Sequence, residues 1–120
     1  MYIENCHGAF ESHSWDLIRE SILLSASNPL DDIWLNGDHD YPCLAILVNG
    51  NKTCIHYFLD SNGNMLQSIG YGNTDVAFGT NGEKTIMPAN AVISLDKAIE
   101  CAKQFFDTGE RPNCIEWRFL

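Results

Sequence analysis

The stretch that decides the fold runs from Met87 to Phe119 and reads MPANAVISLDKAIECAKQFFDTGERPNCIEWRF. Within it, Ser94 stands where an N-cap side chain accepts a hydrogen bond from a first-turn N–H. Gly109 suits the left-handed position that follows a last helical turn, and Pro112 prevents the helix from resuming. Apolar side chains between these signals recur at three- and four-residue steps, which predicts one buried stripe on a helix. The stripe consists of Leu95, Ala98, Ile99, Ala102 and Phe105.

A strand is expected directly after this helix. Ile115, Trp117 and Phe119 alternate with Glu116 and Arg118, and this period of two is typical of a strand with one buried face. We expect the apolar strand face to pack on the helix stripe, with Trp117 as a core residue.

The preceding sequence predicts one further helix and a meander of strands. A first helix capped by Ser12 or Ser14 should end at Asn28–Pro29, because the residue before a proline is pushed out of the helical region. The turn residues Asn49–Gly50 suit a tight hairpin. Together these signals predict an α+β single domain over residues 1–120, with a central antiparallel meander, two helices packed on it and a C-terminal strand. Strands are expected within 1–10 and at 32–36, 43–48, 52–59, 65–71, 85–87 and 115–119.

Charge is distributed unevenly along the chain. Sixteen acidic and seven basic residues give a net charge of −9, and up to Asp40 eight acidic residues are opposed by Arg19 alone, a net −7. Nucleic acid and anionic membranes are disfavoured as partners because both are bound through Lys and Arg. A basic protein partner is favoured, although solubility alone explains an acidic surface equally well.

The start of the sequence lacks the basic segment of a signal peptide, and no apolar run is long enough to cross a bilayer. We therefore expect a cytoplasmic protein. The five cysteines (Cys6, Cys43, Cys54, Cys101 and Cys114) form no CxxC pair, so we expect reduced and mostly buried thiols.

Three patterns could carry chemistry. Cys54 and His56 point to the same face of an expected strand, as a nucleophile and its base would, but no orienting third residue or nucleophile turn accompanies them. Glycines from Gly70 to Gly82 lack the Lys-Ser/Thr of a phosphate loop and are explained by turns. We assign no catalytic, cofactor-binding or metal-binding residue.

The third pattern is a possible metal site at Asp38, His39 and Asp40, near Asp31 and Asp32. Carboxylates and imidazole are good ligands, but the spacing matches no EF-hand loop. A solvated acidic loop is the better interpretation.

Acidic and aromatic side chains gather in the expected loops, and such combinations favour protein interfaces through aromatic anchors and charge complementarity. The residues of this candidate interface are Asp31, Asp32, Trp34, Asp38, His39, Asp40, Tyr41, Tyr71, Asp75 and Glu83.

The last third of the chain resembles the Imm1 family, the immunity proteins of bacterial polymorphic-toxin and contact-dependent inhibition systems. The resemblance lies in the Ala-rich segment from Asn90, in Phe105–Pro112 with its Thr-Gly turn, and in the closing Glu116–Trp117. It implies an α+β protein without enzymatic activity or cofactor that binds a basic toxin domain 1:1. Family toxins are often nucleic-acid deaminases or nucleases. Matched residues Gly109, Pro112 and Trp117 are read as structural.

Two alternatives stay open. A small-molecule or nucleotide sensor would need a pocket beside the glycine-rich segment. A cysteine-dependent hydrolase would need a reactive thiol, of which Cys54 is the candidate.

Overall fold

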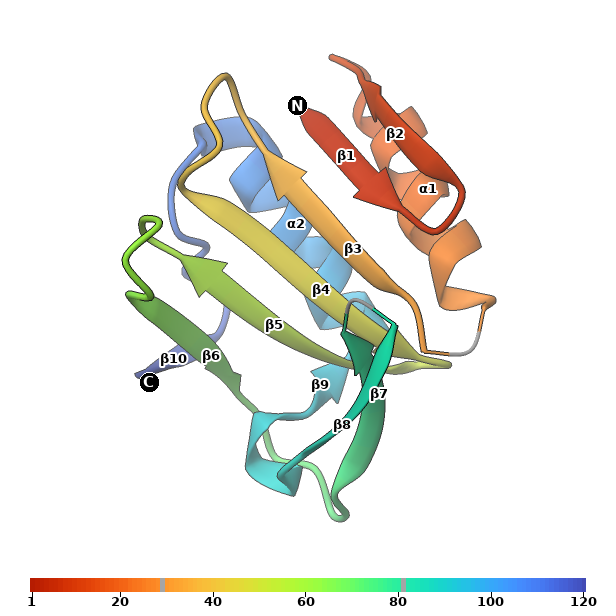
Figure 1. Ribbon diagram of the computed structural model, residues 1–120, viewed down its shortest axis with the longest axis vertical. Helices are drawn as coiled ribbons and strands as arrows, with labels where there is room; N and C mark the ends of the chain where they lie inside the picture. The colour runs from red at the N-terminus through yellow and green to blue at the C-terminus, as the bar shows by residue number, and fades with distance from the viewer. Residues whose placement is uncertain (29, 81) are drawn as a thin grey trace.

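The computed structural model describes residues 1–28, 30–80 and 82–120 and forms a layered α+β domain. An eight-stranded sheet lies at the centre. Behind it in Figure 1 lie α1 (Trp15–Ala26) and α2 (Leu95–Thr108), and in front lies a separate hairpin of β7 (Val76–Thr80) and β8 (Glu83–Met87). The fold class expected from the sequence is confirmed.

The central sheet has the order β10-β6-β5-β4-β3-β1-β2, and β9 pairs with β5 beside this path. Each pairing between described strands is antiparallel. The N-terminal edge is a hairpin of two strands, where the sequence suggested one, and a short 3₁₀ turn, η1 (Ala89–Ala91), precedes β9. The bounds are β1 Tyr2–Asn5, β2 Gly8–Glu11, β3 Asp32–Asn36, β4 Cys43–Asn49, β5 Lys52–Phe58, β6 Met65–Ile69, β9 Ile93–Ser94 and β10 Glu116–Phe119.

The main core lies between the sheet and the helices. The α2 stripe predicted from the sequence supplies fully buried side chains to it, including Ala98, Ala102 and Phe105. Both end signals of α2 are confirmed. The Ser94 hydroxyl accepts a hydrogen bond from the Lys97 N–H (3.2 Å), and Gly109, at φ 69°, donates its N–H to the Phe105 carbonyl (2.8 Å).

The first helix starts where expected, with Ser14 at the N-cap position and Ser27 at the C-cap, but the Ser14 side chain makes no capping hydrogen bond. The stop signal proposed at Asn28–Pro29 falls partly on Pro29, which lies outside the described residues. The β4–β5 hairpin is confirmed, with Gly50 at φ 63° in its turn.

The expected packing of β10 against α2 requires a correction. Helix α2 packs on β4 and β5, whereas β10 pairs with β6 at the sheet edge. Trp117 is therefore half-buried at the margin of the core, with its ring 6.0 Å from that of Tyr57 and its Nε1–H donating to the Pro112 carbonyl (2.8 Å). Phe119 is 69% exposed, so the expectation that it is buried was wrong.

The glycines after β6 are more than turn residues. A side chain at Gly70 would place its Cβ 1.8 Å from the Val92 carbonyl oxygen, and one at Gly72 would lie 2.6 Å from the Ala89 oxygen. The Gly70 and Gly72 N–H groups donate to the carbonyls of Asn90 (2.7 Å) and Ala89 (3.2 Å). Close approach of two backbones therefore requires glycine here.

Replacing Gly70 by Ala should lower the free energy of unfolding by about 2–3 kcal/mol, because the added Cβ must displace backbone rather than a mobile side chain. Gly37→Ala is the matched control, since a Cβ there meets nothing within 4 Å, and its effect should stay within about 0.5 kcal/mol. Urea denaturation of both variants checks this, and equal losses would contradict the close-approach argument.

Candidate protein-interaction surface

Strand β3 divides the candidate residues between two faces of the sheet. Ile33 and Leu35 are buried in the core, while Asp32, Trp34 and Asn36 alternate with them and are partly exposed. Because successive side chains of a strand point to opposite faces, Trp34 lies on the side away from the helices.

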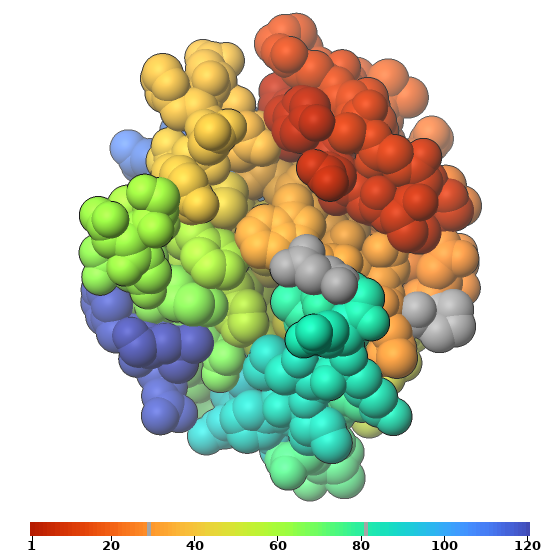
Figure 2. Space-filling model, in the orientation of Figure 1, coloured from red at the N-terminus to blue at the C-terminus, as the bar shows by residue number. Residues whose placement is uncertain are grey.

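Strand register extends this face across the sheet. Trp34 stands opposite Glu4 on β1 and Ala45 on β4, and the row continues through His56 and Gln67. The β7–β8 hairpin covers one end of the same side, where Val76 and Phe78 pack on Leu47 and Cys54. Figure 2 views this side, with the hairpin over its lower part. We call the remainder of this side the open sheet face. Its exposed or half-buried residues are Tyr2, Glu4, Trp34, Asn36, Phe58, Met65 and Arg118, and Cys43, Ala45, His56 and Gln67 lie buried between them.

An aromatic platform occupies the open sheet face. The rings of Trp34 and Phe58 stack with centroids 5.4 Å apart, and His56 meets Phe58 edge-on at 6.2 Å. The Trp34 Nε1–H donates to Asp32 Oδ2 (2.8 Å), which fixes the indole. Both Trp34 and Phe58 are half-buried. Aromatic side chains held this way present apolar area to a partner at little cost in conformational entropy.

Acidic side chains border the platform on one side. Glu4 is the β1 neighbour of Trp34, Asp32 is hydrogen-bonded to it, and Glu11 on β2 stands opposite Tyr2. The far edge of the same face carries the cation Arg118, opposite Gln67. The acidic bias of the first third of the chain is therefore present on this surface, over β1, β2 and β3.

Asp31 differs from Asp32 in its exposure to solvent. Its side chain is 6% exposed, and its Oδ1 accepts the Asp32 N–H (2.8 Å). The hydrogen bond and charge of the Asp31 carboxylate raise the pKa of the nearby Cys6 thiol. The residue offers a partner little area.

The loop after β3 folds back onto the end of α2. Asn36 Nδ2 donates to the Gly37 and His39 carbonyls (3.2 and 3.0 Å), and the Tyr41–Pro42 peptide is cis. Asp38, His39 and Tyr41 line a hollow of about 570 Å³ together with Phe105, Phe106 and Gly109. Asp38, Asp40 and Tyr41 are exposed, so this loop extends the acidic border beyond β3.

The remaining candidates lie on either end of the β7–β8 hairpin. Glu83 is at its turn, the end at which Gly79 approaches the Leu30 backbone, and so lies near the start of β3. Asp75 is at the other end, where its Oδ1 accepts the Ala89 N–H (2.9 Å). Tyr71 is 87% exposed. The structure thus gathers most of the predicted set around β3 and leaves Tyr71 and Asp75 apart.

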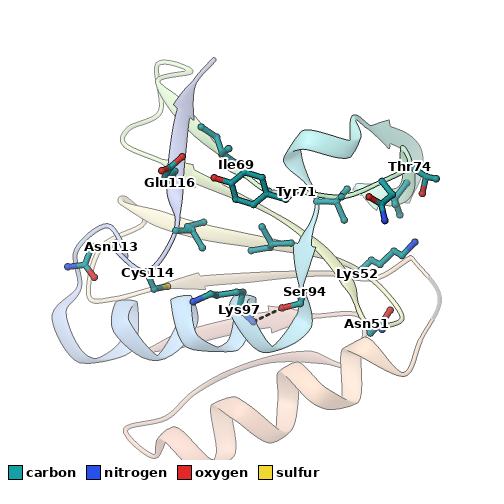
Figure 3. Close-up of a pocket in the computed structure, with 17 residues that line it drawn as sticks. Asn51, Lys52, Ile69, Tyr71, Thr74, Ser94, Lys97, Asn113, Cys114 and Glu116 are labelled. Atoms are coloured by element: carbon teal, nitrogen blue, oxygen red, sulfur yellow. Dashed lines mark hydrogen bonds between the residues drawn. The ribbon is translucent and has the colours of Figure 1, made fainter.

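Tyr71 stands at the rim of a separate groove of about 690 Å³ (Figure 3). Ile69, Val92 and Ile93 supply apolar lining, while Lys52 and Lys97 contribute positive charge. The glycine-rich segment does therefore border a cavity, as the sensor alternative requires.

Sequence reasoning missed Glu4, His56 and Phe58 as parts of the open sheet face. The alternation Cys54, His56, Phe58 was visible, but nothing in it indicated that the hairpin would cover Cys54 and leave Phe58 uncovered.

Cys54 and His56 do lie together, with Sγ and Nε2 3.9 Å apart, but both are buried. Burial raises the pKa of the Cys54 thiol to about 11 and lowers the pKa of His56, whose Nε2 is 2.9 Å from Gln67 Oε1. A raised thiol pKa disfavours the thiolate form that a cysteine nucleophile uses.

Over residues 1–28, 30–80 and 82–120, no group of three or more His, Cys, Asp and Glu side chains is placed to hold a metal ion. In the same ranges, no helix combines the length and apolar character needed to span a membrane.

The structure is an α+β domain whose sheet carries the Trp34–Phe58 stack, with Glu4 and Asp32 beside it, on the side away from the helices. The family model described as immunity protein Imm1 matches residues 19–119. The chain therefore belongs to the Imm1 family of immunity proteins, as its C-terminal motifs suggested. No curated protein matches the sequence.

The thiol environments predict a reactivity order. In the native protein at pH 8, iodoacetamide should modify the exposed Cys6 first, while Cys54 should react about 100-fold more slowly than in the urea-unfolded chain, because its thiolate is scarce and buried. Peptide mapping of alkylated protein measures both rates. Native labelling of Cys54 at the unfolded rate would restore the hydrolase alternative.

Proposed function

We propose that this immunity protein neutralises a cognate toxin domain by binding it 1:1 through the open sheet face and the adjoining acidic loop. The observation that carries the proposal is the Trp34–Phe58 stack (5.4 Å) bordered by Glu4 and Asp32. An apolar centre with a charged border is the usual composition of a specific interface.

The toxin's expected chemistry follows from this border. A toxin that acts on nucleic acid holds its substrate with Lys and Arg, and the same groups complement Glu4, Asp32, Asp38 and Asp40. We therefore propose a nuclease or deaminase domain with a basic substrate groove, met in the cytoplasm and blocked without any catalytic step by the immunity protein.

Binding of the toxin domain to one face of the sheet is compatible with direct blockage of the toxin's substrate groove. An acidic border would occupy the sites that phosphates otherwise fill, while the aromatic platform supplies contact area. This mode predicts competition between the immunity protein and nucleic acid for the toxin domain.

The small-molecule alternative has one observation in its favour, the 690 Å³ groove beside Gly70–Thr74. The groove is lined by the ends of β5, β6, β9, α2 and β10, and neither Trp34 nor Phe58 is among its lining residues. Variants on the platform therefore distinguish the two functions without disturbing the groove.

Charge steering provides the first test of the interface. Asp38→Asn with Asp40→Asn should slow association with the toxin domain and flatten its salt dependence, because opposite charges accelerate encounter and are screened over about 8 Å at physiological ionic strength. Biosensor kinetics across a salt series measure this. Asp16→Asn with Glu20→Gln is the control, since it removes the same charge from exposed positions on α1, behind the sheet. Equal rates for the two double variants would place the interface elsewhere.

Anchor truncation provides the second test. Trp34→Ala should accelerate dissociation by roughly 10- to 100-fold while leaving association nearly unchanged, since buried aromatic anchors act mainly on complex lifetime. Tyr71→Ala, which removes an aromatic ring from the groove side, is the control and should dissociate like the wild type. Thermal unfolding of both variants without toxin shows whether faster dissociation reflects a lost contact with the toxin or a less stable immunity protein. Faster dissociation for Tyr71→Ala alone would move the interface to the groove.

A further inference from the structure

Two cysteines far apart in the sequence meet beside the groove. The Sγ atoms of Cys101, in the middle of α2, and Cys114, just before β10, lie 2.9 Å apart. Both are free thiols. The other cysteines lie elsewhere in the fold: Cys6 after β1, Cys43 at the start of β4 and Cys54 within β5.

Hydrogen bonds on both sides of Cys114 hold this contact. The Asn113 N–H donates to Gln104 Oε1 (2.8 Å), which ties the preceding residue to the next turn of α2. Trp117 Nε1–H donates to the Pro112 carbonyl (2.8 Å). The segment is therefore positioned by contacts other than the thiols. From 2.9 Å, the two sulfurs need to approach by only about 1 Å to reach bonding distance.

The two thiols differ in access. Cys101 is fully buried, whereas Cys114 is half-buried and lines the 690 Å³ groove, where Figure 3 shows it beside α2. Burial and the neighbouring Cys114 raise the pKa of the Cys101 thiol. A reagent that enters the groove therefore reaches Cys114 first, and Cys101 is the thiol that reacts second.

We propose that Cys101 and Cys114 are a modification site, a dithiol that small disulfides of the glutathione type convert into an internal disulfide. The Cys114 thiolate attacks the small disulfide and releases one small thiol, leaving a mixed disulfide. The Cys101 sulfur then attacks Cys114 Sγ, expels the second small thiol and forms the protein disulfide. The protein loses two electrons and two protons, and one small disulfide becomes two thiols.

The bond would join the middle of α2 to the segment that leads into the edge strand β10. It closes a short loop and restricts the unfolded chain, and an excess of reduced thiol reverses it. The site acts through the scaffold and the groove wall, so the proposal does not depend on the toxin-binding face.

The test compares one protein in two redox states. Purified full-length protein is incubated with oxidised or with reduced glutathione, alkylated under denaturing conditions and examined by intact mass and peptide mapping. We expect the oxidised sample to contain a Cys101–Cys114 linked peptide. Its intact mass should correspond to alkylation of the other three of its five cysteines, with two hydrogen atoms fewer than a chain that has three alkylated and two free thiols. Its Tm should exceed that of the reduced sample by about 10 °C.

Two variants control the assignment. Cys6→Ser removes the exposed thiol and should still form the linked peptide, whereas Cys114→Ser should form none and show equal Tm in both buffers. If Cys114→Ser fails to fold, Cys114→Ala takes its place. A stable glutathione adduct on Cys114, complete alkylation of all five cysteines in the oxidised wild type, or a lower Tm on oxidation would each overturn the proposal.

Discussion

Burial of the α2 stripe against β4 and β5 is the interaction on which the rest of the structure depends. Ala98 and Ala102 let the helix approach the sheet closely, and Phe105 fills the space beyond them, where its ring meets Tyr57 edge-on at 6.1 Å. The apolar area removed from water at this contact provides the main driving force for folding. Because the helices occupy one side of the sheet, the other side is available for function.

The side of the sheet away from the helices is covered only in part. The β7–β8 hairpin seals Leu47 and Cys54 beneath Phe78, and Asn49 Nδ2 secures it by donating to the Ala77 carbonyl (2.9 Å). Beyond the hairpin, the sheet exposes an aromatic stack where an antiparallel sheet facing water would ordinarily carry polar side chains. This departure from the usual pattern is consistent with the interface that we propose, in which a toxin domain would bury the apolar area.

The acidic border disfavours pairing of two copies of the protein through this surface. Like charges on Glu4, Glu11 and Asp32 oppose self-association of two copies through the same face, while they attract a basic partner. The groove beside Tyr71 has a different character, with Lys52, Lys97 and Glu116 among its lining residues. The two surfaces therefore suit different chemistry, and the Cys101–Cys114 pair belongs to the second.

Local signals in the sequence determined the elements whose ends and periodicity are self-contained. Ser94 and Gly109 define α2 because capping is settled within a few residues, and the alternation along β3 separates Trp34 from Ile33 for the same reason. Tertiary structure alone decided which faces are covered. Trp117 and Phe119 alternate as core residues do, yet β10 lies at the edge of the sheet, where Phe119 is exposed. The Trp34–Phe58 platform required three strands in register, and Gly70 required the approach of η1, because contacts between distant segments leave no periodic trace in either one.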